Sequence, residues 1–316
     1  MTGQKNRLTF ALFEFKTKTL NSFHLPPYKG STFRGAFGHT IKKIACVKKQ
    51  SDCDGCLLKT KCIYSYIFET PPPEDSSMMK NYTAAPHPFI LEPPLEIKTD
   101  YEKGEDLNFS LVLTGKAIDY LPYFIYAFDE MGKNGIGRDR GRYDIEEVIN
   151  HKADRLNGTV IYGREKKLLS PPGILSDGEF HNNKEIDKIT ISFITPARIK
   201  YEEKFVNTLE FHIFMRNILR RISLLTYFHC NGKLDVDFKD IIEKAAGISV
   251  IKSDLQWLDW ERYSNRQQSR MKMGGLIGDI TFTGDLKDFL PYITTGKYIH
   301  VGKGASFGLG KYEIYF

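Results

Sequence analysis

The chain of 316 residues lacks a hydrophobic run long enough to cross a membrane. Its longest apolar stretch, near residues 121–128, is far short of the roughly 20 residues that a transmembrane helix needs. The N-terminus also lacks the pattern of a signal peptide, because Glu14 and Lys16 interrupt its short apolar segment. With 26 Gly and 14 Pro, the chain has too little of either residue for a low-complexity or collagen-like protein. We therefore expect a cytoplasmic globular protein, long enough for two domains.

Positive charge is concentrated near the N-terminus. The whole chain holds 45 Lys and Arg against 39 Asp and Glu, a net charge of +6. Residues 1–62 contain 12 of these cations and only 3 of the acids, so the remainder of the chain is slightly acidic. A basic lobe on an otherwise balanced protein favours a polyanionic partner, although a solvated basic face gives the same count.

Cysteine is scarce, yet four of the five cysteines lie in one short segment with the spacing C-x6-C-x2-C-x5-C. They are Cys46, Cys53, Cys56 and Cys62. In a cytoplasmic protein such crowding favours metal binding over disulfides. Four thiolates can complete a tetrahedral, purely structural zinc site, while an iron–sulfur cluster and reduced thiols without metal are the alternatives.

An internal repeat indicates two copies of one domain. When the chain is shifted by 169 residues, positions 114–145 show 10 identities in 32 without a gap. The most compact match aligns Leu121-Pro122-Tyr123 with Leu290-Pro291-Tyr292. A repeat unit of this length is too long for a solenoid.

Each copy predicts the order β-α-β-β-α-β. In the first copy we expect strands over 8–15, 107–113 and 142–148, with a helix over 31–45 and a second helix after residue 115. In the second we expect strands over 188–193, 249–257, 276–282 and 311–316, with a long helix over 205–228. The fold is therefore expected to be α+β, with two tandem ferredoxin-like (RRM-like) domains. The expected boundaries are 1–150 with a Cys-rich insertion at 46–62, a linker at 151–186, and 187–316.

Two segments of the second copy have features of RNA-binding surfaces. Residues 300–310 form a Gly-rich loop that matches neither a Walker loop nor a dinucleotide fingerprint. Its glycines would allow backbone N–H groups to approach phosphates, with Lys303 supplying charge, unless the loop is merely a tight connection. Residues 257–275 interleave aromatic rings with Arg and Lys, which suits single-stranded RNA but also a strand with solvated charges.

Four motifs in this order resemble the CRISPR precursor-RNA-processing endoribonucleases of the RAMP superfamily. They are GSTFRGAFGH at 30–39, TPARI at 195–199, RYSNRQ at 262–267 and the terminal Gly-rich loop. The resemblance covers nearly the whole chain. It implies binding of CRISPR repeat RNA and its metal-independent cleavage to a 2′,3′-cyclic phosphate and a 5′-hydroxyl, without a cofactor for catalysis. The RNA-binding residues expected from these motifs are Arg34, Arg262, Arg266, Gln267, Lys303, Gly304, Ser306 and Gly308.

Attack by a 2′-hydroxyl requires a general base, an acid for the leaving oxygen and cations for the phosphate charge. Of the eight histidines, His39 has the most suitable neighbours, because it shares a helix face with Lys42 and Lys43 in the basic lobe. The resemblance also implies a catalytic histidine near this helix. We therefore predict His39 as the base, with Tyr28 and the two lysines assisting. A surface or capping role for His39, with His300 or His24 as the base, is the alternative.

Two other functions fit the same sequence. RAMP proteins that do not cleave RNA bind guide RNA within CRISPR effector complexes, and this chain could be such a subunit. In the other alternative, the cysteine segment is a protein-docking module and the repeat is a scaffold, which leaves the basic lobe unexplained. The expected partners are repeat RNA or its processed guide RNA, an effector complex in the first alternative, and no membrane.

Overall fold

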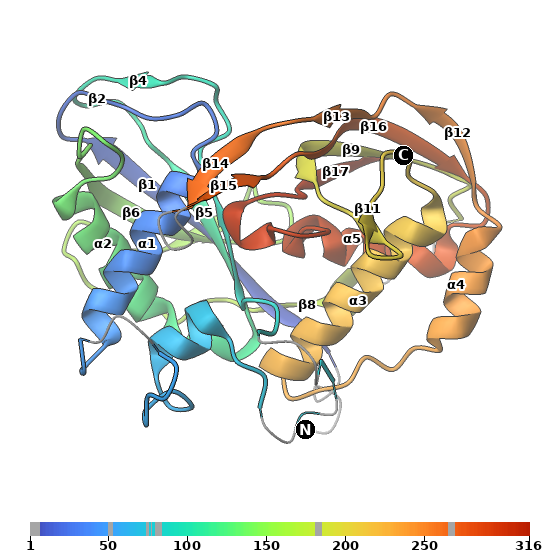
Figure 1. The fold of residues 1–316 in the computed structure, drawn as a ribbon, viewed down its shortest axis with the longest axis horizontal. Helices are drawn as coiled ribbons and strands as arrows, with labels where there is room; N and C mark the ends of the chain where they lie inside the picture. The colour runs from blue at the N-terminus through green and yellow to red at the C-terminus, as the bar shows by residue number, and fades with distance from the viewer. Residues whose placement is uncertain are drawn as a thin grey trace. The chain divides into compact units, whose positions relative to one another are not determined.

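The computed structural model describes residues 7–49, 53–73, 76, 78–79, 84–180, 185–264 and 269–316. The chain divides into two compact units (Figure 1). The N-terminal unit is Thr9–Leu175, and the C-terminal unit combines Met1–Leu8 with Ser176–Phe316. The backbone N–H of Asp177 donates to the carbonyl of Leu8 at 3.1 Å, so both ends of the N-terminal unit connect to adjacent points of the C-terminal unit.

The N-terminal unit is built on an antiparallel sheet with the strand order β3-β5-β1-β6-β7. Its strands are β1 (Thr9–Thr19), β2 (Phe23–His24), β3 (Phe89–Glu92), β4 (Asp100–Tyr101), β5 (Phe109–Thr114), β6 (Tyr143–His151), β7 (Gly158–Tyr162) and β8 (Leu175–Ser176), which ends in the next unit. Its helices are α1 (Gly30–Ala45), the π-helix η1 (Ser65–Glu69), the 3-10 helix η2 (Gly115–Tyr120) and α2 (Leu121–Asn134).

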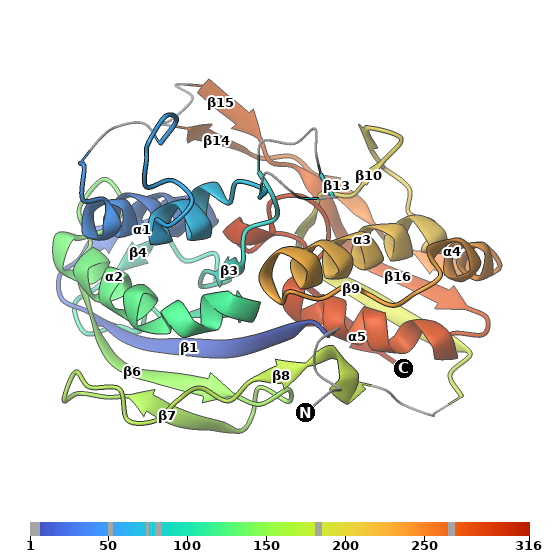
Figure 2. The ribbon, with the colours of Figure 1, turned by 90° about the horizontal axis from the view of Figure 1, so that it is seen from below.

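Buried and less buried side chains alternate along the second half of β1, which explains why both helices pack on the same face of this sheet. Phe13, Phe15 and Thr17 face the core and are buried, while Lys16 between the last two is half-buried. Figure 2 shows α1 and α2 on the same side of β1. Their aromatic rings fill the core, where Phe37 of α1 stacks on Phe124 of α2 with 5.2 Å between ring centroids.

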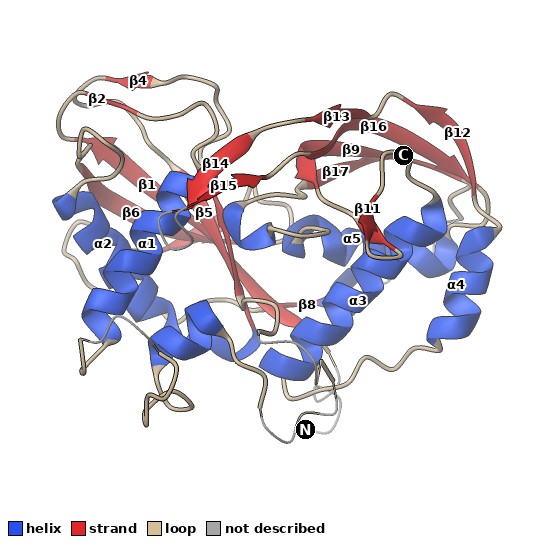
Figure 3. Cartoon of the chain, viewed as in Figure 1, coloured by secondary structure: helices blue, strands red, loops and turns tan. Residues whose placement is uncertain are grey.

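The C-terminal unit repeats this plan with the strand order β12-β16-β9-β17, all antiparallel, and β13 beside β16. Its strands are β9 (Lys188–Ala197), β10 (Lys200–Tyr201), β11 (Lys204–Phe205), β12 (Ser249–Ser253), β13 (Gln256–Leu258), β14 (Glu261–Ser264), β15 (Ser269–Lys272), β16 (Gly275–Thr283) and β17 (Tyr312–Tyr315). Its α-helices are α3 (Phe211–His229), α4 (Phe238–Ala246) and α5 (Leu290–Ile299), and its 3-10 helices are η3 (Asp177–Phe180), η4 (Lys287–Phe289) and η5 (Ala305–Phe307). The three α-helices lie on one side of the sheet (Figure 3).

The expected mixed α+β fold with antiparallel sheets is confirmed. Residues matched by the repeat occupy equivalent places, since Tyr143 and Tyr312 are both fully buried at the start of the strand that pairs with the first strand of their unit, β6 with β1 and β17 with β9. The long helix expected over 205–228 is shorter at its start, because Phe205 lies in the β10–β11 hairpin and α3 begins at Phe211. No helix of the described chain is long and apolar enough to cross a membrane.

Candidate nucleic-acid interface

Helix α1 carries the candidate base on its exposed face. Phe33, Phe37 and Ile41 recur every four residues and are fully buried, which fixes the rotation of the helix about its axis. His39 therefore points away from the core and is exposed. Within the described part of the chain, His39 makes no hydrogen bond or ion pair, so both ring nitrogens are accessible to a substrate.

The two lysines beside His39 have different surroundings. Lys43 is exposed, whereas Lys42 is half-buried with its Nζ 5.3 Å from the centre of the Tyr64 ring. Both lie in the last turn of α1, where the helix dipole favours cations. Lys43 is therefore the more accessible of the two to a phosphate.

The two glycines of α1 have opposite surroundings. A Cβ atom added at Gly38 would overlap the Phe68 ring, so the chain's own packing requires glycine there. A Cβ atom added at Gly35 would have no atom within 4 Å. Gly35 lies one turn before His39 on the same exposed face, and no packing within the unit accounts for it. This face of α1 is open to the close approach of another molecule.

Arg34 is engaged inside the N-terminal unit. Its guanidinium lies 4.4 Å from the centre of the Phe68 ring, and one Nη donates to Nε2 of His87 at 3.2 Å. Nδ1 of His87 is 2.9 Å from the Thr70 hydroxyl, so this ring is bonded through both nitrogens. The predicted RNA contact of Arg34 stays a prediction.

Tyr28 is suited to donating a hydrogen bond rather than to accepting a proton. Burial, with the nearby charge of Glu92, raises the pKa of Tyr28 well above its usual value of 10.0. Glu92 is itself buried and accepts two hydrogen bonds from Arg155, at 2.7 and 3.1 Å. Tyr28 therefore remains a neutral phenol at working pH.

The alternative bases are less accessible to RNA than His39. His300 is fully buried, and its Nδ1 lies 3.1 Å from the carbonyl oxygen of Leu309. His24 is exposed but paired with Asp100 at 3.0 Å. Among these three histidines, His39 alone combines exposure with a lysine on the same face.

The structure gives no support for the metal site predicted in the cysteine segment. Among the described residues, which include all four of these cysteines, no three or more His, Cys, Asp or Glu side chains converge in a metal-ligating arrangement. Cys53 and Cys62 instead pack against the edge of the hydrophobic core. Burial raises the pKa of the Cys53 thiol, and the nearby Cys62 and Cys46 add to this effect. The expectation of a tetrathiolate zinc site is not supported by this geometry.

The Gly-rich loop folds tightly against its own unit. Gly302 and Gly310 have φ values of +82° and +74°, and a Cβ atom on either would overlap the carbonyl of Arg198 or Val301, respectively. Left-handed backbone and close carbonyls both require glycine. The packing of the loop itself therefore accounts for these two glycines.

The predicted RNA contacts of this loop differ in accessibility. Lys303 is exposed, Gly304 is half-buried, and Ser306 and Gly308 are buried. The carbonyl of Gly308 accepts a hydrogen bond from the Thr195 hydroxyl at 2.8 Å. RNA binding by these four residues stays a prediction, with Lys303 the most accessible of them.

The remaining predicted RNA contacts lie in or beside the β14–β15 hairpin. Arg262 lies in β14, where its backbone is paired with Met271 of β15. Arg266 and Gln267 lie outside the described residues. The sequence analysis did not predict this two-stranded hairpin, which carries part of the cationic segment.

Sequence reasoning did not single out Arg221 of α3. Its Nε donates to the carbonyl of Ile299 at 2.6 Å and so caps the C-terminus of α5, just before the Gly-rich loop. Burial lowers the pKa of Arg221 to about 10, and its described contacts include no carboxylate. Its guanidinium remains charged at neutral pH. A helix-borne arginine gives no sequence signal that it caps a helix 78 residues away.

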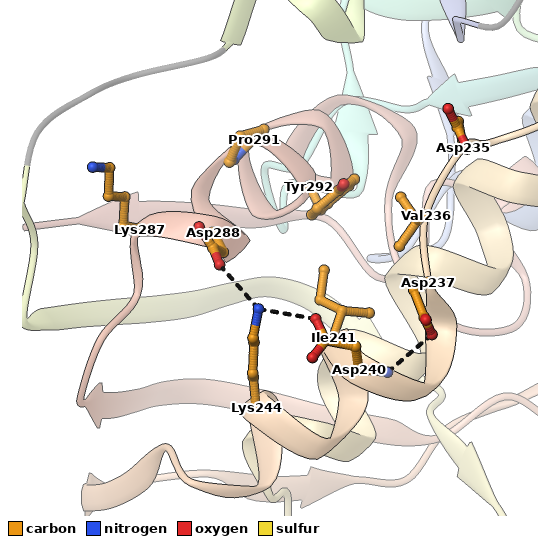
Figure 4. A pocket seen from close by; sticks show the side chains of 10 residues that line it. All are labelled: Asp235, Val236, Asp237, Asp240, Ile241, Lys244, Lys287, Asp288, Pro291 and Tyr292. Atoms are coloured by element: carbon orange, nitrogen blue, oxygen red, sulfur yellow. Dashed lines mark hydrogen bonds and ion pairs between the residues drawn. The ribbon is translucent and has the colours of Figure 1, made fainter.

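A pocket of about 380 Å³ lies between α4 and α5 (Figure 4). Its wall contains four aspartates and two lysines. Lys244 pairs with Asp240 at 2.9 Å and with Asp288 at 3.7 Å, which leaves the pocket with a net negative charge. Such a pocket repels phosphates, so it does not belong to the RNA interface.

An exposed histidine on a basic helix and a cationic Gly-rich loop are suited to a protein that acts on RNA. Comparison with protein families agrees with this class. Residues 8–174 match the family AF_1859_N, described as an N-terminal domain, and residues 191–312 match the CRISPR-associated endoribonuclease Cas6. The first match covers more than half of the chain, so the chain belongs to the AF_1859_N family, and its residues 191–312 are similar to the CRISPR-associated endoribonuclease Cas6.

Individual relatives are distant in sequence. An uncharacterized protein of Archaeoglobus fulgidus is 24% identical over 294 residues, covering 92% of this chain and 93% of that protein. A Cas6 product complex superposes with a TM-score of 0.58 at 13% identity, over 97% of this chain and 100% of that one. Cas6 of Thermus thermophilus gives 0.53 at 13% identity, over 98% and 99%. These structures are similar in fold.

A longer polypeptide also shares this fold. In a partial Cas6-RT-Cas1–Cas2 complex, the matching chain gives a TM-score of 0.60 at 12% identity. The match covers 98% of this chain but only 46% of that one, so this chain spans less than half of that relative.

Proposed function

We propose that this protein binds CRISPR repeat RNA in precursor transcripts and cleaves it by metal-independent acid–base catalysis, with His39 as the general base. The observation that carries the proposal is the position of His39, which is exposed and unpaired among the described residues on a face shared with Lys43. The match of residues 191–312 to the CRISPR-associated endoribonuclease Cas6 supports repeat RNA as the substrate.

In the proposed reaction, His39 accepts the proton of the 2′-hydroxyl before the scissile phosphate. The 2′-oxygen forms a bond to phosphorus while the bond from phosphorus to the 5′-oxygen breaks. The products are a 2′,3′-cyclic phosphate and a 5′-hydroxyl, whose proton comes from the imidazolium or another acid. Lys43 would stabilise the charge that accumulates on the phosphate, and neutral Tyr28 would serve only as a hydrogen-bond donor.

The test compares His39→Ala with His24→Ala, a matched control at a second exposed histidine of the same unit. We expect His39→Ala to lower single-turnover cleavage of the protein's own repeat RNA by about 10²- to 10⁴-fold while RNA binding is kept. His24→Ala should cleave at nearly the wild-type rate. A substrate with a single 2′-deoxy sugar before the scissile phosphate should bind and remain uncut.

Two results would contradict the proposal. If His39→Ala cuts at the wild-type rate, the base lies elsewhere. If the wild type binds its repeat RNA but never cuts it, the protein is a non-cleaving RAMP subunit that holds guide RNA, and an effector complex becomes the expected partner.

We also infer that each unit is a ferredoxin-like domain. The strand orders β3-β5-β1-β6 and β12-β16-β9-β17 support this inference, because both place the first strand between the third and the fourth. The element order β-α-β-β-α-β in each unit is that of the split βαβ motif.

A further inference from the structure

The C-terminal unit carries a cluster of aromatic rings and cations that the cleavage chemistry does not use. The Arg198 guanidinium lies 4.6 Å and the Lys200 Nζ 5.4 Å from the centre of the Phe205 ring. The ring of Trp257 lies 6.3 Å from the same ring, tilted by 56°. Phe205 is 37% exposed, although large aromatic side chains are usually buried well beyond that. We call these four residues the 198–257 platform.

The β10–β11 hairpin presents Phe205 at the surface. Lys200 and Phe205 are direct partners in this two-stranded pair, so their side chains lie on the same face. The turn between the strands contains Glu202 and Glu203, which adopt φ values of +47° and +62° without being glycine. Left-handed backbone at such residues costs about 1–2 kcal/mol each, so the fold holds this hairpin in shape against local preference.

Arg198 connects the platform to both segments expected to bind RNA. One Nη donates to the carbonyls of Lys272 and Gly274, at 2.8 and 3.1 Å, where β15 leaves the β14–β15 hairpin. The carbonyl of Arg198 accepts from the backbone N–H of Lys303 in the Gly-rich loop at 2.9 Å. The platform therefore lies between the base of the cationic hairpin and the exposed lysine of the loop.

The charge of Arg198 is not balanced by an acid. Burial lowers the pKa of Arg198, and no carboxylate pairs with it among its described contacts. The acids nearby have other partners: Glu203 is highly exposed and 3.5 Å from Lys200, and Asp259 accepts from the Trp257 indole at 2.7 Å. A half-buried cation without a counter-ion favours an anionic occupant beside it.

A nucleotide of single-stranded RNA supplies both components that this surface lacks. A base offers a flat π-face for the exposed ring, and its phosphate offers the missing negative charge. We propose that the 198–257 platform is a stacking subsite for one unpaired nucleotide of the substrate RNA. Phe205 and Trp257 contact the base, while Lys200 and Arg198, which both lie against the Phe205 ring, supply positive charge beside its phosphate. This inference rests on the proposed RNA substrate but concerns binding rather than the chemical step.

The test separates binding from cleavage by using repeat RNA with a 2′-deoxy sugar at the cleavage position, titrated against the full-length protein. Phe205→Ala and Phe205→Leu should both weaken binding by about 5- to 150-fold, the usual effect of removing one stacked base contact. Phe205→Tyr keeps the π-face and should bind as the wild type does. Phe238→Ala is the matched control, since Phe238 is 41% exposed in the same unit but begins α4 beside the acidic pocket. It should leave binding unchanged.

A second readout identifies the stacked base. With 2-aminopurine placed at successive unpaired positions of the RNA, fluorescence should be quenched at one position by the wild type and by Phe205→Tyr, but not by Phe205→Leu. Single-turnover cleavage at saturating protein should stay within about twofold of wild type in the control variant Phe238→Ala. These readouts distinguish this subsite from the catalytic proposal, because a wild type that binds but never cuts refutes only the latter.

Equal affinities for wild type and Phe205→Leu, with both proteins folded by circular dichroism, would overturn the subsite. Phe205→Leu retains an apolar contact with Trp257, so it also decides the matter if Phe205→Ala fails to fold. A wild type that binds no repeat RNA would overturn the subsite together with the proposed function.

Discussion

Replacing Gly35 with alanine should make the protein more stable and less active. Gly35 lies inside α1 with ordinary helical backbone, and an added Cβ meets no atom within 4 Å. Alanine should therefore stabilise the helix by about 0.8–1 kcal/mol, or raise the melting temperature of a unit of this size by roughly 2–4 °C. If RNA lies against this face beside His39, the new methyl group occupies its space. Overlap comparable to an overpacked core costs about 1–3 kcal/mol, which corresponds to roughly 5- to 150-fold weaker binding.

Gly38→Ala is the internal comparison, because the same methyl group there meets the Phe68 ring. The gain in helix propensity is then offset by overpacking of about 1–3 kcal/mol, so Gly38→Ala should be neutral or less stable than wild type. Urea unfolding gives the stabilities, and titration with 2′-deoxy repeat RNA gives the affinities. A stabilised Gly35→Ala that binds and cuts RNA as wild type does would refute the placement of RNA on this face.

Three further predictions concern stability and metal. Burial alone would raise the pKa of Asp129, but hydrogen bonds from Lys133 and Lys166 lower this pKa below its usual value of 3.8. The ionised Asp129 therefore stabilises the folded state fully above pH 3.8, and this stabilisation is lost as the pH falls through the lower pKa of the folded state. Urea unfolding between pH 3 and pH 7 should therefore show Asp129→Asn less stable than wild type at pH 7 and closer to it at pH 3; a constant difference would contradict this. Glu92→Gln should lower the free energy of unfolding by about 3 kcal/mol, because it removes the buried carboxylate that pairs with Arg155. A loss below about 0.5 kcal/mol would show that this ion pair contributes little to stability. Because no metal-ligating group of side chains is found among the described residues, EDTA should change neither the melting temperature nor the cleavage rate. One tightly held zinc per chain, measured by elemental analysis, would contradict this and show that the cysteine segment binds a metal.

Much of the fold follows from local patterns in the sequence. Helical spacing of buried residues predicts α1, and the 169-residue repeat aligns Tyr143 with Tyr312, which begin equivalent strands of their units. The short strand β3 carries too little pattern of its own, because pairing with β5 decides its conformation. Phe205 extends the apolar spacing of the following helix, yet pairing with Lys200 places it in a hairpin.

The candidate site was predictable only where one helix determines it. The exposed face that carries His39 and Lys43 follows from the positions of buried phenylalanines on the same helix. Arg198 could not be assigned a role in this way, because its partners at Lys272, Gly274 and Lys303 lie 74 to 105 residues further along the chain. The cysteines differ, since no metal-ligating group among the described residues accompanies their metal-like spacing.

The hydrogen bond between Leu8 and Asp177 has a thermodynamic consequence for the unit between them. If the N-terminal unit unfolds while the C-terminal unit stays folded, the released chain is a closed loop of about 170 residues rather than a free coil. Closing a loop of that size removes about 5 kcal/mol of chain entropy, expressed as free energy at room temperature, from the unfolded state. The C-terminal unit thereby stabilises the helix that carries His39 through chain connectivity. An excised fragment of residues 9–175 would lose that contribution even if every one of its internal contacts were retained.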